Sequence, residues 1–404
     1  MILNKNKDMN VFLNYLFVAY ALVIPISRAG IVLFSILICI IWFFQPNFKT
    51  NIKYLAKNKF SIIFILFIIY TFVGLLWSSN LEEGIDYAKR YWYYLPMFII
   101  ATNLKKEYLN IVLSAFLIGM LISEIISYGI FFELLDIKNK SSVDPTPFMN
   151  HIQYSVFVVF TSLFLLNKIY FTKKIKYKII YSLFFLTVTT NIFINGGRIG
   201  YITFFVSLLL VISLNVKSKI KVGLIFVLML GTSLYAAYNY SPTFQARFAH
   251  TMNEIKLMQS NQFHKSLSIV PRLALYDVGT KIILENPIFG TGTGEEMSTF
   301  HKTVNEMYPQ YHFLKIVEHF HNIFLHTAVQ LGLLGLILQL LIFYYLLKIK
   351  IKNRYYLNIK YIFMSIYLMV SMSGNMFHQQ FTMALFALMV GIFLAINRHE
   401  KRLD

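Results

Sequence analysis

The chain has 404 residues, of which 57% are hydrophobic and only 14% are charged. A soluble domain has about 45–50% apolar and about 25% charged residues, so this composition excludes an ordinary soluble protein. The formal charge of +19 would suit a nucleic-acid-binding protein, but the basic residues fall in short clusters between apolar runs. Membrane proteins carry their basic residues in such positions. We therefore expect contact with membrane lipids and no nucleic-acid partner.

Apolar runs long enough to cross a bilayer recur along the whole chain and predict an all-α, polytopic membrane protein. We expect about twelve transmembrane helices in a single integral membrane domain, residues 1–404. The predicted spans cover residues 11–27, 29–44, 60–77, 91–102, 108–132, 152–166, 179–194, 201–214, 222–238, 323–347, 361–376 and 381–396.

The lysine-rich connections all fall on the same side of this alternation. They lie near residues 49–59, 105–106, 168–178, 217–221 and 348–360. By the positive-inside rule that side is the cytoplasm, so both termini are expected to be cytoplasmic. The connections that contain Glu82, Asp136 and Arg198 are then extracytoplasmic.

Residues 239–320 contain no spanning run and are predicted to form one large extracytoplasmic loop between the ninth and tenth spans. Apolar residues recur at helical spacing from Phe244 to Met258, and Pro271 is suited to the first turn of a second helix. Acidic and basic residues balance within the loop. A long loop that folds is uncommon unless it is functional.

The first candidate catalytic residue follows this loop, in the stretch HNIFLHTAVQLGLLG that begins at His321. A neutral imidazole with a pKa near 6.5 is suited to act as a general base. Asn322 could orient that imidazole or hydrogen-bond a sugar. The spacing of His319, His321 and His326 does not match a compact zinc motif, so we expect no metal and no cofactor.

Arg198, in the turn NGGRIG, and Arg272, at the start of a loop helix, are candidate anion-binding residues. A guanidinium group matches phosphate oxygens, although either arginine could also be a simple boundary or surface charge. The segment GTGTG, residues 290–294, lacks the Lys-Ser/Thr of a phosphate-binding loop and is more typical of a tight turn. The amides of Gly290 and Gly292 could still line an anionic site.

Together these features resemble the O-antigen ligase family, within a wider superfamily of ligases and polymerases. The ligase-type pattern of His-Asn, nine residues, Gly, two residues and Gly is complete from His321 to Gly335. The segment RLALYDVGTKIILENPIFGTGTGE resembles the family's arginine-led helix and its Pro-x-x-Gly-x-Gly turn. NGGRIG resembles the family's arginine after the seventh span, where many members have Ser in place of Gly197.

The resemblance implies glycosyl transfer on the periplasmic face of the bacterial inner membrane. The donor would be an O-antigen glycan on undecaprenyl diphosphate, and the acceptor would be a sugar hydroxyl of lipid A–core. In this interpretation His321 is the general base, while Arg272 and Arg198 bind the diphosphate and stabilise its developing charge. Asn322, Gly290 and Gly292 would contact substrate.

Three alternatives stay open at this stage. An O-antigen polymerase would use the same donor with a second lipid-linked glycan as acceptor. A protein O-oligosaccharyltransferase would transfer the glycan to protein. A secondary transporter would also suit about twelve spans, although such transporters tend to have related halves, which this sequence does not obviously contain.

Overall fold

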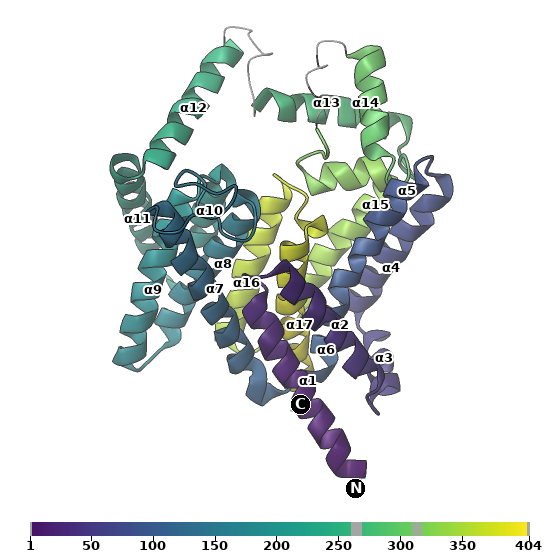
Figure 1. The fold of residues 1–404 in the computed structure, drawn as a ribbon, viewed down its shortest axis with the longest axis vertical. Helices are drawn as coiled ribbons and strands as arrows, with labels where there is room; N and C mark the ends of the chain where they lie inside the picture. Colours follow the sequence, from purple (N-terminus) through teal and green to yellow (C-terminus); the bar gives the residue numbers. More distant parts are fainter. Residues whose placement is uncertain (1, 260–268, 309–310, 312–313, 315–316, 402–404) are drawn as a thin grey trace.

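The computed structural model describes residues 2–259, 269–308, 311, 314 and 317–401. Among these residues every regular element is a helix, and the long helices pack side by side in a bundle (Figure 1). Within the described chain, eight helices are long and apolar enough to cross a membrane, or nine if one bent pair is counted. This confirms the prediction of an all-α, multi-pass membrane protein. The eight are α4 (Lys59–Val73, continued by the 3₁₀ turn η1, Gly74–Trp77), α7 (Leu109–Phe131, preceded by η3, Lys106–Tyr108), α8 (His151–Phe171), α9 (Ile175–Ile194), α10 (Arg198–Asn215), α11 (Lys219–Tyr240), α15 (Ile323–Lys348) and α17 (Gln380–Lys401).

The other four predicted spans form helices that are short, bent or more polar. They correspond to α1 (Ile2–Val23), α2 (Arg28–Phe43) with α3 (Phe48–Leu55), η2 (Arg90–Tyr94) with α6 (Leu95–Asn103), and α16 (Arg354–Ser371). A break that contains Pro46 separates α2 from α3, and the two helices are bent by 107°. In α16, Lys360 is buried and its Nζ donates to the carbonyls of Leu347 (2.8 Å) and Ile349 (2.7 Å) at the end of α15.

Helix α17 lies at the centre of the bundle, and its residues 381–398 are all buried. A helix that is apolar around its whole circumference is most stable when it is surrounded by other helices. Close packing against α6 depends on Gly391, because a Cβ there would lie 2.9 Å from the Ile100 Cβ and the Met97 carbonyl oxygen. Helix α11 differs, since Ala237 is its only buried residue.

Helix α15 is broken at Gly332, whose backbone has φ +64° and ψ −166°. The segment 287–292 packs into the break and supplies backbone partners. Thr291 N donates to Val329 O (2.9 Å), Gly292 N to Gln330 O (2.9 Å) and Leu333 N to Pro287 O (2.9 Å). A kink inside a membrane helix is tolerated when neighbouring groups satisfy the freed backbone in this way.

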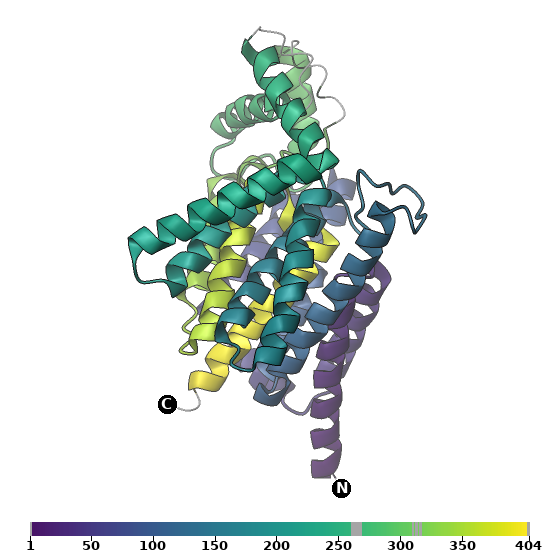
Figure 2. The ribbon, with the colours of Figure 1, turned by 90° about the vertical axis from the view of Figure 1, so that its left-hand side faces the viewer.

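The N-terminal end of α1 and the C-terminal end of α17 lie at the same end of the bundle, and several shorter helices gather at the opposite end (Figures 1 and 2). These are α5 (Leu81–Lys89), α12 (Pro242–Gln259), α13 (Ile269–Glu285) and α14 (Glu296–Met307). The predicted loop 239–320 therefore contains α12, α13 and α14. A small separate core joins α13 and α14 to the start of α15 through buried residues such as Leu275, Phe300 and Phe320.

Candidate functional site

His321 lies in the short connection that leads into α15. Its backbone adopts a left-handed conformation with φ +51°, which for a non-glycine residue costs about 1–3 kcal/mol and is frequent at functional sites. Phe320, the preceding residue, is buried in the small core. The Nδ1 atom of His321 is buried and forms no hydrogen bond with any described residue. An unpartnered ring nitrogen is free to hydrogen-bond a substrate.

The surroundings of His321 keep its imidazole neutral. Its ring centroid lies 4.2 Å from that of His319. Burial, with smaller contributions from the neighbouring His319 and Arg272, lowers the pKa of His321 to about 4. The imidazole is therefore unprotonated at pH 7 and able to accept a proton.

Asn322 connects His321 to the loop helices. Its Oδ1 caps α15 by accepting from Phe324 N (2.9 Å) and Leu325 N (3.2 Å), and its Nδ2 donates to the Tyr276 hydroxyl on α13 (2.6 Å). These contacts occupy both the Oδ1 and the Nδ2 atoms of the Asn322 side chain. They support a positioning role, whereas the predicted contact of Asn322 with a sugar stays a prediction.

Of the two predicted arginines, Arg272 lies within electrostatic range of both Arg198 and His321. Arg272 lies one helical turn before Tyr276 on α13, and Arg198 is the first residue of α10. Burial lowers the pKa of Arg272 below its usual value, and the charge of Arg198 lowers it further. Since Arg272 in turn lowers the pKa of His321, the three predicted catalytic residues lie within electrostatic range along this chain of neighbours.

Arg198 is held by α12. Its Nη1 donates to Thr251 Oγ1 (3.1 Å) and lies 3.8 Å from Glu254 Oε2. Glu254 is buried and also lies 3.8 Å from His250 Nδ1. One carboxylate thus accompanies two guanidinium groups, which leaves a local excess of positive charge suited to an anion.

The turn before Arg198 explains why this chain has glycine at position 197. A Cβ at Gly197 would collide with the Oγ of Ser155, and that hydroxyl donates to His151 O (2.7 Å). A hydroxyl group therefore already occupies the space that a serine at 197 would need. Asn195 Oδ1 stabilises the turn by accepting from Gly197 N (2.9 Å).

Gly290 and Gly292 pack into the fold at positive φ, +71° and +106° respectively. A Cβ on Gly290 would lie 2.5 Å from Gly332 N, and one on Gly292 would lie 2.8 Å from the Ser78 Cα. The amide of Gly290 donates to Asn286 O (3.1 Å), and that of Gly292 to Gln330 O. These contacts give both glycines a structural role, and their predicted contact with substrate stays a prediction.

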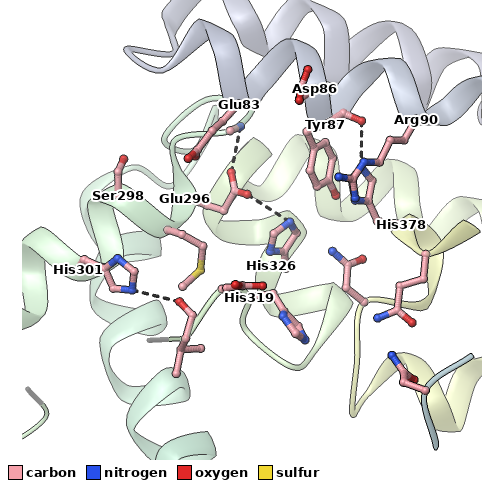
Figure 3. A pocket seen from close by; sticks show the side chains of 17 residues that line it. Glu83, Asp86, Tyr87, Arg90, Glu296, Ser298, His301, His319, His326 and His378 are labelled. Atoms are coloured by element: carbon pink, nitrogen blue, oxygen red, sulfur yellow. Dashed lines mark hydrogen bonds and ion pairs between the residues drawn. The ribbon is translucent and has the colours of Figure 1, made fainter. Parts of the chain in front are cut away.

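A cavity of about 910 Å³ lies next to His319 (Figure 3). His319 lines it, whereas His321, Arg198 and Arg272 are not among its lining residues. Most of the described lining residues are polar. They are Glu83, Asp86, Tyr87, Arg90, Asn150, Gly294, Glu296, Met297, Ser298, His301, Val317, Glu318, His319, His326, Asn375, His378 and Gln379.

A buried carboxyl group and two further histidines form one wall of this cavity. Glu296 Oε2 accepts from Gly294 N and Gln330 Nε2, both at 3.0 Å, and its Oε1 lies 3.5 Å from His326 Nε2. Burial raises the pKa of Glu296 to about 7. Tyr87 stacks on His378, with ring centroids 3.7 Å apart, and faces His326 at 5.6 Å (Figure 3). This wall was not predicted, since its residues come from four separate segments.

A membrane enzyme with a polar site at one end of its helix bundle is the class that this geometry defines. Residues 183–340 match the family model described as O-antigen ligase. The matched segment runs from α9 into α15 and contains Arg198, Arg272 and His321. This match supports a place for the chain in the O-antigen ligase family. No curated protein matches the chain.

The family match supports a general activity but does not separate a ligase from a polymerase. The chain is an enzyme of the O-antigen ligase or polymerase type, which acts like a glycosyltransferase on lipid-linked glycans in a membrane environment.

Proposed function

We propose that the protein is an O-antigen ligase. It transfers O-antigen polysaccharide from undecaprenyl diphosphate to a sugar hydroxyl of lipid A–core. The observation that carries the proposal is the position of His321, whose buried Nδ1 has no described partner. Arg272 lies in electrostatic range of this residue, and His319, in ring contact with it, lines the polar cavity. The arginines suit a diphosphate, and the cavity suits the hydroxyl groups of a sugar.

The reaction is a displacement at the anomeric carbon of the donor sugar. The acceptor hydroxyl oxygen bonds to that carbon while its proton moves to a ring nitrogen of His321. The bond from the anomeric carbon to the diphosphate oxygen breaks, and its electron pair stays on the departing undecaprenyl diphosphate. Arg272 and Arg198 stabilise the negative charge that develops on this group. Asn322 positions His321 by fixing the start of α15 against Tyr276.

The acceptor sugar occupies the cavity beside His319. Asn150, Asn375 and Gln379 offer amides, and Glu296 and Glu318 offer carboxylates, which together match the donors and acceptors of a polyol. The ring of Tyr87 forms part of the wall. A cavity of about 910 Å³ is large enough for several sugar units, since small-molecule sites are usually about 300–1,000 Å³.

We place the protein in the bacterial inner membrane with both termini in the cytoplasm and the site facing the periplasm. The one-sided distribution of lysines supports this orientation. The positions of α12, α13 and α14 also support it, because these helices lie at the end of the bundle opposite the N-terminal end of α1 and the C-terminal end of α17 (Figure 1). A reporter domain inserted after Gln259 would test it. A signal from the cytoplasm would contradict the orientation.

Deletion of the gene tests the reaction. If the protein is a ligase, glycolipid gels of the deletion strain will contain bare core, with polymer stranded on the lipid carrier. Core that bears single repeat units would identify a polymerase instead. Loss of glycoprotein with intact lipopolysaccharide would identify a protein O-oligosaccharyltransferase. Expression of the wild type should restore the normal pattern, and His321→Ala at matched expression should not.

A further inference from the structure

A second cavity, of about 580 Å³, adjoins the first and shares Arg90, His378 and Gln379 with it. Its described lining contains three basic residues and no carboxylate. The full set is Arg28, Lys89, Arg90, Trp92, Tyr93, Gln153, His378, Gln379, Gln380, Phe381 and Met383. The two cavities therefore meet at Arg90 but have opposite electrostatic character.

Two of the basic residues form no ion pair among the described residues, although Arg90 lies within electrostatic range of Asp86. Lys89 pairs with Asp86, whereas neither Arg28 nor Arg90 forms an ion pair with a described carboxylate. The guanidinium of Arg28 lies over the Phe381 ring, 5.6 Å from its centroid. Its carbonyl accepts from Gln380 Nε2 (2.9 Å), which ties the start of α2 to the start of α17. The side chain and the carbonyl of Arg28 thus both contact α17 at the wall of the cavity.

We propose that Arg28 and Arg90 form a second anion-binding site, which takes a phosphate group on the head of a glycolipid. The proposal rests on the proposed function, in which the first cavity holds the acceptor sugar. Guanidinium groups are the side chains best matched to phosphate oxygens. Trp92 and Tyr93 add amphipathic rings of the kind found where lipid head groups meet protein.

Charge explains why the phosphate occupies this cavity and not the first. The first cavity is lined by the carboxylates of Glu83, Asp86 and Glu318, which repel an anion. Since the two cavities share Arg90, one phosphorylated glycolipid can place its phosphate at Arg28 and Arg90 and extend a sugar toward His319. The donor diphosphate is the other possible source of the anion, but His321 does not line this cavity.

Steady-state kinetics of the purified full-length protein test the site. Arg28→Gln and Arg90→Gln should each raise the KM for phosphorylated lipid A–core about tenfold to a hundredfold, the range for loss of one charge-assisted hydrogen bond. The donor KM and kcat should stay near the wild-type values. With acceptor from which phosphatase has removed the phosphates, Arg28→Gln, at a residue that lines only the second cavity, should behave like wild type. Lys302→Gln, an exposed charge on α14 outside both cavities, is the matched control.

Two outcomes would overturn the proposal. A rise in the donor KM in place of the acceptor KM would assign the anion to the donor. Unchanged KM values in both variants, with either acceptor, would mean that no phosphate binds there.

Binding of radiolabelled lipid A–core to the protein in detergent, without donor, separates this proposal from the proposed function. Stronger retention of phosphorylated than of dephosphorylated lipid, lost in Arg28→Gln, supports the site even if the wild type transfers no glycan. Equal retention of the two lipids contradicts the site even if transfer is normal.

Discussion

Two groups of residues of different character adjoin the paired imidazoles of His319 and His321. The arginine side consists of the guanidinium groups of Arg272, within electrostatic range of His321, and Arg198, and the cavity side is the cavity that His319 lines together with carboxylates and amides. The arginine side also contains one buried carboxylate, Glu254. The cavity side contains four carboxylates and Arg90. A diphosphate and a polyol need opposite surroundings, so this asymmetry favours binding of the donor at the arginine side and of the acceptor at the cavity side.

The two sides are also held in place by different means. On the arginine side, a side-chain hydrogen bond from Asn322 to Tyr276 joins α15 to α13, and one from Arg198 to Thr251 joins α10 to α12. On the cavity side, the backbone of segment 287–292 fills the break at Gly332 and leads to Glu296. Substitutions on the arginine side should therefore change the kinetics for the donor, and substitutions on the cavity side should change the kinetics for the acceptor.

Replacement of His321 should affect both sides and give the largest effect. A general base contributes about 10²- to 10⁴-fold to rate, so His321→Ala should lower kcat by that factor with little change in either KM. Transfer of labelled glycan by purified protein measures this. Normal transfer at matched expression would rule out His321 as the base.

The pH dependence of kcat tests the surroundings of the same residue. A histidine with an ordinary pKa loses its base form as the pH falls through about 6.5. Burial, His319 and Arg272 place the pKa of His321 near 4, so its base form is complete at pH 7 and is lost only as the pH approaches 4. We expect activity at pH 5.5 to stay close to that at pH 7, once stability at each pH is controlled. An acid limb centred near 6.5 would mean that the site is more hydrated.

Replacement of Arg272 should affect the arginine side alone. Arg272→Lys keeps the charge but loses the forked pair of donors. Loss of one charge-assisted contact corresponds to about one to two decades in rate, and we expect kcat/KM for the donor to fall by that amount. The acceptor KM should not change. Full activity would make Arg272 an ordinary surface charge.

Glu296→Gln should affect the cavity side alone, with a rise of about tenfold in the acceptor KM. It should also change stability. The pKa of Glu296 is raised to about 7 in the fold from 4.5, so the contribution of this group to stability is greatest below pH 4.5 and is lost as the pH rises through 7. The glutamine variant does not lose this stability as the pH rises. The amount by which its Tm exceeds the wild-type Tm should therefore grow from pH 5 to pH 8. A constant Tm difference, or a change in donor KM, would contradict this assignment.

The bundle could be predicted from sequence because strong local constraints apply to it, whereas the assignment of Arg198 and Arg272 as site residues stays a prediction. A segment in a bilayer must satisfy its own backbone, so apolar runs such as the one in α7 become helices. The spacing from His321 to Gly332 also has a local meaning. It sets the length of the first part of α15, from the Asn322 cap to the kink.

The cavity side could not be predicted because tertiary packing alone brings its residues together. Tyr87, Glu296, His326 and His378 come from four segments with no common spacing. The only local signals were an acidic pair directly after GTGTG and a histidine in the short turn before α17. The kink at Gly332 could not be predicted for a similar reason, because it depends on contacts with segment 287–292, which is distant in the sequence.

Asn322→Ala should have the smallest effect and tests whether Asn322 belongs to either side. Loss of a helix cap costs about 0.5–2 kcal/mol, and loss of the Tyr276 contact loosens α13. We expect a lower Tm and a modest fall in kcat, with both KM values unchanged.

Asn322→Asp provides the matched control, because its carboxylate can cap α15 and accept from the Tyr276 hydroxyl. It should recover most of the stability and of kcat if Asn322 only positions His321. If instead Asn322→Ala raises the acceptor KM alone and Asn322→Asp does not restore it, the Asn322 amide contacts the sugar directly. Asn322, the cap of α15, would then contact substrate on the cavity side in addition to positioning His321.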